Sequence, residues 1–497
     1  MRPLTCLLLA AACAAAETRP NFVVINVDDL GYADIGPFGS RLNRTPNLDR
    51  MAKEGMRLTS YYAAPVCSPS RAMLMTGCYP KRVLPTPHVL FPAGEVGLNP
   101  EEVTVAETLR SVGYATGCVG KWHLGDQAAF LPGAQGFDFS YGIPYSNDMG
   151  TAADGSKSDL GKPAPKAETK ANPGKMNPPE TGLRGGDQPP LPMLRDGKAV
   201  ARVRQQEQQM LVADYTREAE AFIRRSKDRP FFLYLPHSSV HFPLYPGKDW
   251  AGKSPHGHYS DWVEETDWSV GRILDTLREL GLERRTLVLF TSDNGGTTRG
   301  SNAPLKGHKG STWEGGVRVP TIAWWPGRIA PGATTAMITG MFDVHPTLAA
   351  LAGARMPERR IDGIDLSPVL LGEDGAKGHD EFLYFRGMNL EALRVGKWKL
   401  MLEGSNAPLR SKQPKKEAPL RLYDLEADPG ETNDQAARHP DVVKTLLARA
   451  AAADADLGRT ETGPGVRPLG RVPNPLPVIG HDGQVRPDAV GTSPRFP

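Results

Sequence analysis

The chain has 497 residues, and its 59 lysine and arginine residues nearly balance its 56 aspartate and glutamate residues, which leaves a formal net charge of +3. A charge this small, spread along the chain, lacks the concentrated basic face of a nucleic-acid groove. We therefore expect no nucleic-acid partner, and any anionic substrate must be held by a few placed residues. The length predicts one large domain with an appendage, or a few smaller domains.

Residues 1–16 have the pattern of a secretory signal peptide, with an arginine near the start, an apolar run and then small residues. The run is too short to span a bilayer, and no later stretch offers about 18 uncharged apolar residues. We therefore expect a soluble, exported protein, periplasmic or secreted, without a membrane span. A lipoprotein anchored through Cys13 is the weaker alternative, because the preceding residues fit a lipobox poorly. Cleavage would leave an odd number of cysteines and hence at most one disulfide among Cys67, Cys78 and Cys118.

Three short apolar runs, rich in β-branched and aromatic residues, have the pattern of buried strands. They cover Asn21 to Val27, Arg229 to Leu235 and Thr286 to Thr291. Helical spacing of apolar residues occurs between them, from Thr104 to Val112 and from Tyr215 to Arg225. Strands that alternate with helices predict an α/β sandwich, in which ligands gather where the strands end.

Changes of composition divide the chain. Residues 151–197 are rich in Pro, Gly, Lys and Ser and have no apolar period, which predicts a long surface insertion bordering the ligand site, within a domain spanning 17–370. Residues 371–460 contain three short strand patterns followed by a helical pattern from Asp441 to Ala453, which predicts a small antiparallel sheet with a helix packed on it. Residues 461–497 are again rich in Pro and Gly and predict a loosely ordered tail.

Two pairs of oxygen-bearing side chains follow predicted strands directly. Asp28 and Asp29 end the first strand, and Asp293 and Asn294 end the strand from Thr286. Adjacent carboxylates at a buried strand end repel each other unless a cation lies between them. Either pair alone is typical of a turn, but the two pairs at matched strand ends favour a metal site. Hard oxygen donors indicate Ca²⁺, or alternatively Mg²⁺, over Zn²⁺.

Cations and imidazoles occur in three further stretches. Gly120-Lys121-Trp-His123-Leu-Gly places a cation two residues from an imidazole, a pair that can bind an oxyanion and move a proton. Candidates of the same kinds follow in two later stretches: His237, His241, Lys306 and Lys309. Each of these residues taken singly is typical of ordinary structural work.

Together these motifs resemble the type I sulfatases of the alkaline phosphatase superfamily. Cys67-Ser-Pro-Ser-Arg71 matches the first family signature, Cys-x-Pro-x-Arg, and the Gly120 to Gly125 motif matches the second. Their order along the chain is also the family's. The resemblance extends to arylsulfatases and N-acetylgalactosamine-6-sulfatases, and it implies a large mixed sheet sandwiched by helices, as in alkaline phosphatase, with the smaller C-terminal sheet beside it. The resemblance also implies that residues 17–370 form the catalytic domain.

In this family the signature cysteine is oxidised to Cα-formylglycine during export, so the resemblance implies this modification at Cys67 and a formylglycine-generating enzyme as a maturation partner. A hydrated aldehyde has one hydroxyl to attack sulfur and keeps a second to expel the product, whereas a serine would remain esterified. The alternative is a buried structural cysteine. Cys78 and Cys118 are left free to pair or not.

The resemblance also implies a role for each matched residue. A calcium ion would be bound by five residues: Asp28, Asp29, Cys67, Asp293 and Asn294. Arg71 would orient the nucleophile, and Lys121 and Lys309 would hold the sulfate oxygens. His241, which fits the family pattern better than His237 does, would protonate the leaving alcohol, and His123 would accept a proton from the nucleophile.

Three residues are substrate-side candidates. Ser146 matches a serine of arylsulfatase-like members, while His237 and Lys306 are additions or departures from the family pattern. Asn147 stands where some relatives have His.

The expected reaction is release of inorganic sulfate from a sulfated carbohydrate or an aryl sulfate. Two alternatives stay open: a phosphatase or phosphodiesterase of the same superfamily, and a binder of sulfated glycans that has lost catalysis. The first would normally use a Thr or Ser nucleophile and extra His ligands. The second conflicts with the intact set of candidate residues.

Overall fold

The computed structural model describes residues 19–165, 179–406 and 418–491. The signal peptide predicted for 1–16 lies outside these residues, as do the centre of the predicted insertion and the last six residues of the predicted tail.

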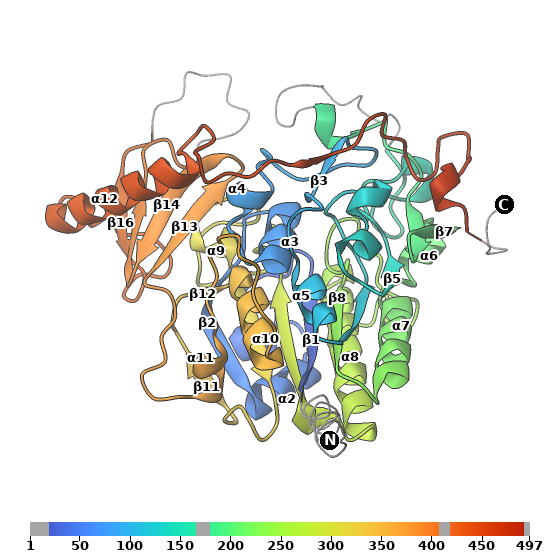
Figure 1. The fold of residues 1–497 in the computed structure, drawn as a ribbon, viewed down its shortest axis with the longest axis horizontal. Coiled ribbons are helices and arrows are strands. Elements are labelled where there is room, and N and C mark those ends of the chain that lie inside the picture. Colours follow the sequence, from blue (N-terminus) through green and yellow to red (C-terminus); the bar gives the residue numbers. More distant parts are fainter. Residues whose placement is uncertain (1–18, 166–178, 407–417, 492–497) are drawn as a thin grey trace, which may run out of the picture.

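A mixed sheet of eleven strands forms the centre of the molecule (Figure 1). Its order is β11-β2-β10-β9-β1-β8-β4-β5-β6-β7, and β12 also pairs with β2. The central strands β9, β1, β8, β4 and β5 are parallel, whereas β10, β6 and β7 run antiparallel to their neighbours. The bounds are β1 (Asn21–Val27), β2 (Met56–Tyr62), β4 (Ala115–Val119), β5 (Phe139–Gly142), β6 (Pro192–Arg195), β7 (Lys198–Arg202), β8 (Phe231–Pro236), β9 (Thr286–Ser292), β10 (Arg318–Trp324), β11 (Ala333–Thr335) and β12 (Thr339–Gly340).

Helices cover both faces of this sheet. One face packs against α2 (Pro46–Glu54), α7 (Leu211–Ser226) and α8 (His258–Glu279), and the other against α3 (Cys67–Thr76), α5 (Val105–Ser111), α10 (Val344–Ala352) and α11 (Ser367–Leu371). Successive side chains of a strand point to opposite faces, so Phe22 and Val24 of β1 join one core and Val23, Ile25 and Val27 join the other. Burial on both faces explains why β1 is apolar throughout. Shorter helices are α4 (Pro80–Val83), α6 (Gln205–Gln208) and α9 (Glu314–Val317).

The predicted helices and strands of the large domain are confirmed, with small shifts at their ends. Thr104 caps α5 because its hydroxyl accepts a hydrogen bond from the amide of Glu107, whose carboxylate in turn accepts one from the amide of Thr104. This reciprocal pair sets the start of the helix.

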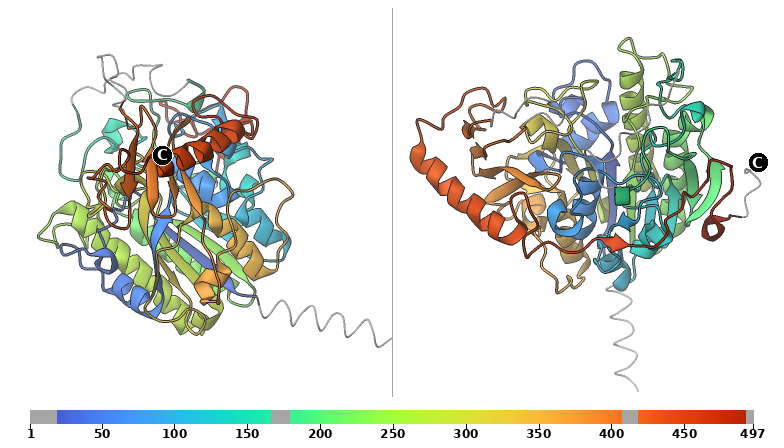
Figure 2. Two further views of the ribbon diagram at one scale, coloured as in Figure 1. Left: turned by 90° about the vertical axis from the view of Figure 1, so that its left-hand side faces the viewer. Right: turned by 90° about the horizontal axis from the view of Figure 1, so that it is seen from above.

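The predicted small antiparallel sheet with a helix is also confirmed. It comprises β13 (Glu381–Arg386), β14 (Asn389–Val395), β15 (Trp398–Met401) and a fourth strand, β16 (Arg421–Asp424), which was not predicted. Helix α12 (Pro440–Leu457) packs on β14, and the sheet and helix lie to one side of the large sheet (Figure 2).

Two segments differ from the surface loop and loose tail that their composition predicts. Strand β6 lies inside residues 151–197, and residues 188–194 are buried. The tail crosses the molecule as an extended strap (Figure 1), in which β17 (Gly470–Arg471) pairs with β3 (Val96–Gly97). Val478 and Ile479 are buried farther along. Few apolar residues anchor each segment, so its amino-acid composition does not indicate that it packs against the rest of the molecule. Among the described residues, no helix is long and apolar enough to cross a membrane.

A buried lysine joins the two sheets. Lys399 of β15 has its ammonium 3.0 Å from the carboxylate of Glu314 in α9 and 2.8 Å from that of Glu431, which follows β16. It also donates to the carbonyl of Thr312 at 2.8 Å. All three charged side chains are fully buried, so none can exchange its partner for water.

We predict that Lys399→Met lowers the free energy of unfolding by about 3–5 kcal/mol, because it leaves the buried carboxylate of Glu431 without its cation and that of Glu314 with only the more distant Arg318. Chemical denaturation measures the change. The matched control is Lys397→Met in the same hairpin, where the lysine pairs with Asp424 at the surface and its loss changes stability little. Equal stability of the two variants would contradict the proposed link.

Candidate active site

The oxygen-bearing side chains of β1 and β9 meet at one edge of the sheet. Because Val27 is in register with Ser292, the residues that follow them lie level with each other, and the amide of Asp293 donates to the carbonyl of Val27 at 2.9 Å. Asp28, Asp29 and Asp293 are all buried. Three carboxylates are therefore held together away from water, as the strand-end pattern predicts.

Cys67 is the first residue of α3 and faces these carboxylates. Its sulfur lies 3.4 Å from Asp28 Oδ1 and 3.4 Å from Lys309 Nζ. Burial, together with Asp28 and Asp293, raises the pKa of the Cys67 thiol well above its ordinary value. The unmodified sulfur is therefore a protonated thiol, which is a poor nucleophile. Cys78 and Cys118 are likewise buried and free, so no disulfide joins them.

Arg71 lies one helical turn after Cys67 and binds the carboxylates with its fork of donors. It donates to Asp293 Oδ2 from Nε at 3.1 Å and from Nη2 at 2.8 Å, and Nη2 is 3.2 Å from Asp28 Oδ2. Burial opposes its charge, but Asp293 and Asp28 outweigh it and hold the pKa of Arg71 above its ordinary value. The guanidinium also donates to the carbonyl of Lys121, which fixes its plane.

Two lysines complete the charge balance. Lys121 follows β4 and pairs with Asp28, and Lys309 is 2.6 Å from Asp29 Oδ1. Gly120 allows the first contact, because its φ is +137° and an added Cβ would lie 1.9 Å from the carbonyl oxygen of Pro236. Three carboxylates thus face three cations, which makes the cluster formally neutral.

His123 is held in a defined tautomer. Its Nε2 lies 3.0 Å from the carbonyl oxygen of Leu90, and since a carbonyl only accepts, this nitrogen carries the proton. Burial, then Lys121 and Arg71, lower the pKa of His123 well below its ordinary value, so the ring is neutral. Nδ1 is then an acceptor, buried and without a hydrogen-bond partner among the described residues. The backbone of His123 has a φ of +64°, an uncommon conformation for a residue other than glycine.

His241 lies at the more exposed side of the cluster. Its Nδ1 donates to the carbonyl of Phe242 at 2.5 Å, and the hydroxyl of Ser146 is 3.2 Å from the same nitrogen. Nε2 is then directed inwards, 3.7 Å from Asp29 Oδ2. Ser146 also accepts from Lys121 Nζ at 3.1 Å, so it bridges the two cationic candidates.

The carboxylates and the amide oxygen of Asn294 suit a hard divalent cation. Four side chains, Asp28, Asp29, Cys67 and His241, have one potential ligand atom each within 4.8 Å of one another. Asn294 donates from Nδ2 to Asp29 Oδ1 at 2.8 Å, while its carbonyl oxygen Oδ1 is buried and has no partner in the described part of the chain. An orphaned buried carbonyl beside carboxylates is an arrangement that a cation would satisfy.

Two predicted residues do not join this cluster. The ring of His237 is fully buried and its Nε2 is 3.1 Å from the hydroxyl of Ser269 in α8. The ammonium of Lys306 donates to the carbonyl of Glu431 at 3.0 Å and lies 3.9 Å from the ring centre of Trp313. Both residues contact structural partners instead of the carboxylates.

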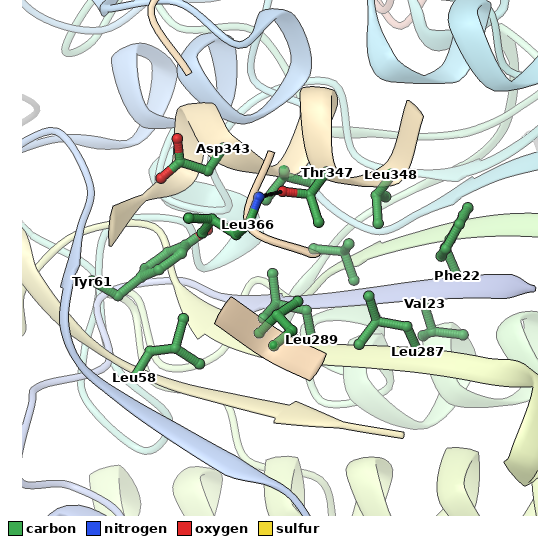
Figure 3. Close-up of a pocket in the computed structure, with 13 residues that line it drawn as sticks. Phe22, Val23, Leu58, Tyr61, Leu287, Leu289, Asp343, Thr347, Leu348 and Leu366 are labelled. Carbon is green, nitrogen blue, oxygen red and sulfur yellow. Dashed lines mark hydrogen bonds between the residues drawn. The ribbon is translucent and has the colours of Figure 1, made fainter. Parts of the chain in front are cut away.

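An apolar cavity of about 30 Å³ lies away from this cluster, between the sheet and α10 (Figure 3). Leu287 and Leu289 of β9 face Thr347 and Leu348 across it. The Thr347 hydroxyl is already engaged, because it accepts from the amide of Leu366 at 2.8 Å. A space of this size holds little more than a water molecule, and its lining is mostly apolar. It is a packing defect, and the chemistry belongs to the strand-end cluster.

The sulfatase family model matches residues 20–354. The chain belongs to the sulfatase family. It is 40% identical to arylsulfatase A of Homo sapiens over 456 residues, which cover 86% of this chain and 85% of the relative. It is 36% identical to N-acetylgalactosamine-6-sulfatase of Canis lupus familiaris over 420 residues, which cover 79% of this chain and 74% of the relative.

Among solved structures, this sulfatase resembles Ps i-CgsB in complex with k-i-k-neocarrahexaose, with a TM-score of 0.72 and 28% identity over 90% of this chain and 95% of that chain. The family resemblance seen in the motifs, the alkaline-phosphatase-like fold and the enzyme class are confirmed. The protein is a sulfuric ester hydrolase.

Proposed function

We propose that this sulfatase releases inorganic sulfate from a sulfated carbohydrate or an aryl sulfate, with Ca²⁺ and a formylglycine derived from Cys67. The observation that supports the proposal most strongly is the position of Cys67. Its sulfur lies between Asp28 and Lys309, at a point where cations, carboxylates and two oriented imidazoles converge.

Ca²⁺ would be held by Asp28, Asp29, Asp293 and Asn294, with the Cys67 side chain as a further ligand; Mg²⁺ is the alternative. The bound ion would supply positive charge that activates the nucleophile and neutralises sulfate oxygens. Burial would raise the pKa of Asp28, but Lys121, His241 and Arg71 outweigh it, so the carboxylate stays ionised. A divalent ion added to a neutral cluster leaves a net charge of about +2, which suits an anionic sulfate ester.

A formylglycine-generating enzyme would oxidise Cys67 during export, and the hydrated aldehyde would supply one hydroxyl to attack sulfur. Loss of the proton from the second hydroxyl would then expel sulfate from the same carbon and re-form the aldehyde. Arg71 would hold the nucleophile in place, since two of its donors are fixed on Asp293. Lys121 and Lys309 lie on either side of the cluster and would bind the sulfate oxygens as negative charge develops on them.

The two imidazoles would divide the proton transfers. His241 would donate a proton from Nε2 to the leaving oxygen, and its Nδ1 hydrogen bond to Phe242 keeps that atom directed into the site. His123 would accept a proton at Nδ1, the atom that geometry and tautomer leave available. Ser146 would help to position His241 and Lys121.

The alternatives are less well supported. A phosphatase would not need a cysteine at the position of Cys67, and a binder without catalysis would not need His123 and His241 to present opposite ring nitrogens, Nδ1 and Nε2, to the site. Export to the periplasm or the medium is part of the proposal and rests on residues 1–16, which lie outside the described residues.

The metal assignment predicts that Asp293→Ala and Asn294→Ala lose most bound calcium and most activity together, because each removes one oxygen ligand. Metal content by mass spectrometry and thermal stability with and without a chelator measure the loss. Asp228→Ala, in the exposed turn after α7, is the control and should keep its calcium. Full activity of the wild-type protein after complete metal removal would refute the assignment.

The assignment of Cys67 predicts that, in a host with a formylglycine-generating enzyme, its tryptic peptide carries an aldehyde or its hydrate and activity scales with that fraction. Cys78 and Cys118 serve as internal controls and stay thiols. Cys67→Ala should abolish turnover with fold and metal retained, and Cys67→Ser should stop after one event, for lack of a second hydroxyl. Repeated turnover by a preparation with only thiol at this position would overturn the mechanism.

The acid assignment predicts a dependence on the leaving group. His241→Ala should slow a sulfated sugar by about 10²–10⁴-fold and an activated nitrophenyl sulfate far less, since nitrophenolate departs without protonation. His237→Gln, which can still bond to Ser269, is the control and should affect both substrates alike. Equal losses for His241→Ala on both substrates would count against its role.

A further inference from the structure

Two polar atoms beside the site have no hydrogen-bond partner within the described ranges. They are Nδ1 of His88 and Oδ1 of Asp148, and both atoms are buried although their side chains are partly exposed. Neither residue belongs to the family motifs in the sequence. A buried polar atom without a partner costs free energy, so its presence on two separate loops calls for an explanation.

The loop of His88 is anchored to the catalytic residues. Two residues after His88, Leu90 accepts the hydrogen bond from His123 at its carbonyl, and its amide donates to Ser68 Oγ at 3.2 Å. Ser68 follows the nucleophile position Cys67 directly. His88 is therefore only two residues from Leu90, which contacts both His123, the proposed general base, and Ser68 at the start of α3.

The loop of Asp148 is likewise anchored to a residue of the site, Ser146. The amide of Met149 donates to the carbonyl of Ser146 at 3.0 Å, which forms a tight turn around Asp148. Ser146 contacts His241 and Lys121, so the turn carries Asp148 past the residue proposed to protonate the leaving group.

Residues of the predicted insertion hold both loops. The amide of Phe91 donates to the carbonyl of Thr181 at 2.7 Å, and the guanidinium of Arg184 lies 5.2 Å from the ring centre of Phe91. Lys157 donates to the carbonyl of Asp148. The described ends of 151–197 thus contact the loops that carry His88 and Asp148.

The local charges define what the two side chains can bind. Burial, then Lys309 and Arg184, lower the pKa of His88 to about 4, so its ring is neutral and offers one donor and one acceptor. Burial alone would raise the pKa of Asp148, but His241, Lys157, Lys121 and a hydrogen bond from the side chain of Ser146 outweigh it, so the side chain is an ionised acceptor. The charge of Asp148 opposes the lowering of the His88 pKa.

We propose that His88 and Asp148 form a leaving-group subsite that binds hydroxyl groups of a sulfated sugar. The inference rests on the proposed sulfatase reaction and narrows its substrate class. A sugar hydroxyl donates and accepts at once, so it matches a neutral imidazole and a carboxylate. An aryl or steryl leaving group has no hydroxyl beside the ester and would leave both buried atoms without partners. Sites built around such hydrogen bonds discriminate strongly against analogues that lack them.

The test compares two substrates in purified protein that carries formylglycine and calcium. A panel of monosulfated hexoses identifies the best sugar substrate of the wild type, and 4-nitrophenyl sulfate is the reference. His88→Ala and Asp148→Ala should each lower kcat/KM for the sugar sulfate by about tenfold to a hundredfold and change it for nitrophenyl sulfate by no more than about threefold. His88→Asn and Asp148→Asn keep a polar atom near the same place and should recover part of the loss.

Deoxy analogues of the sugar sulfate make the test specific. If His88 binds a given hydroxyl, removing that hydroxyl should slow the wild type and have no further effect in His88→Ala. The matched controls are His256→Ala and Asp228→Asn, both exposed and outside the two loops, which should behave as wild type on both substrates.

The outcomes distinguish a failure of the proposed subsite from a failure of the proposed sulfatase reaction. Selective loss on the sugar sulfate, with coupling to one hydroxyl, supports the subsite. Equal loss on both substrates, or no loss on the sugar, overturns it while the sulfatase reaction stands. Wild-type activity on nitrophenyl sulfate without activity on any sugar of the panel also overturns it. Absence of hydrolysis of every sulfate ester would instead refute the proposed function.

Discussion

The structure depends on one electrostatic constraint, the placement of three carboxylates at the buried ends of two neighbouring strands. Asp28, Asp29 and Asp293 cannot be solvated there, and their mutual repulsion in a medium of low polarity would be large. The chain compensates with cations from three separate segments: Arg71 in α3, Lys121 after β4 and Lys309 in the loop after β9. Folding must bring all of these segments to one edge of the sheet. The cations proposed to serve the reaction therefore also offset the repulsion among the buried carboxylates in the folded state.

Much of this arrangement is predictable from sequence because the central strands are buried on both faces. Such strands appear as continuous apolar runs, and in a parallel sheet their C-terminal ends meet, which is why the positions of Asp28 and Asp293 could be inferred together. Strands near the edge of the sheet give no such signal. Strand β6 lies in a segment dominated by Pro, Gly and polar residues, and only its pairing with β5 and β7 identifies it. The strap formed by the tail is hidden for the same reason, since it buries few apolar side chains.

The direction of a side chain after a strand ends is less predictable. His237 and His241 both follow β8 within five residues, and sequence alone offers each as a candidate. The amide of His237 donates to the carbonyl of Asn26, and its ring turns towards α8, whereas the turn that follows brings His241 to the carboxylates. Lys306 and Lys309 diverge similarly. Lys306 lies against Trp313 and reaches Glu431 beyond the small sheet, and this contact fixes the loop from which Lys309 enters the site. Lys306 lies outside the active site, but its contacts thus help to determine the position of Lys309 within it.

This division extends to the site as a whole. On the reaction side, Asp28, Arg71 and Lys121 have fully buried side chains and bind one another, so their geometry leaves little room for change. On the other side, the side chains of His241 and Lys309 are 11% and 18% exposed, and the neighbouring loops are held by hydrogen bonds between backbone groups. Backbone pairing fixes the course of a loop without dictating its side chains. A fold built in this way can keep one chemistry constant while loop residues that face the leaving group change, because the paired charges of the three carboxylates and their three cations lie on other segments.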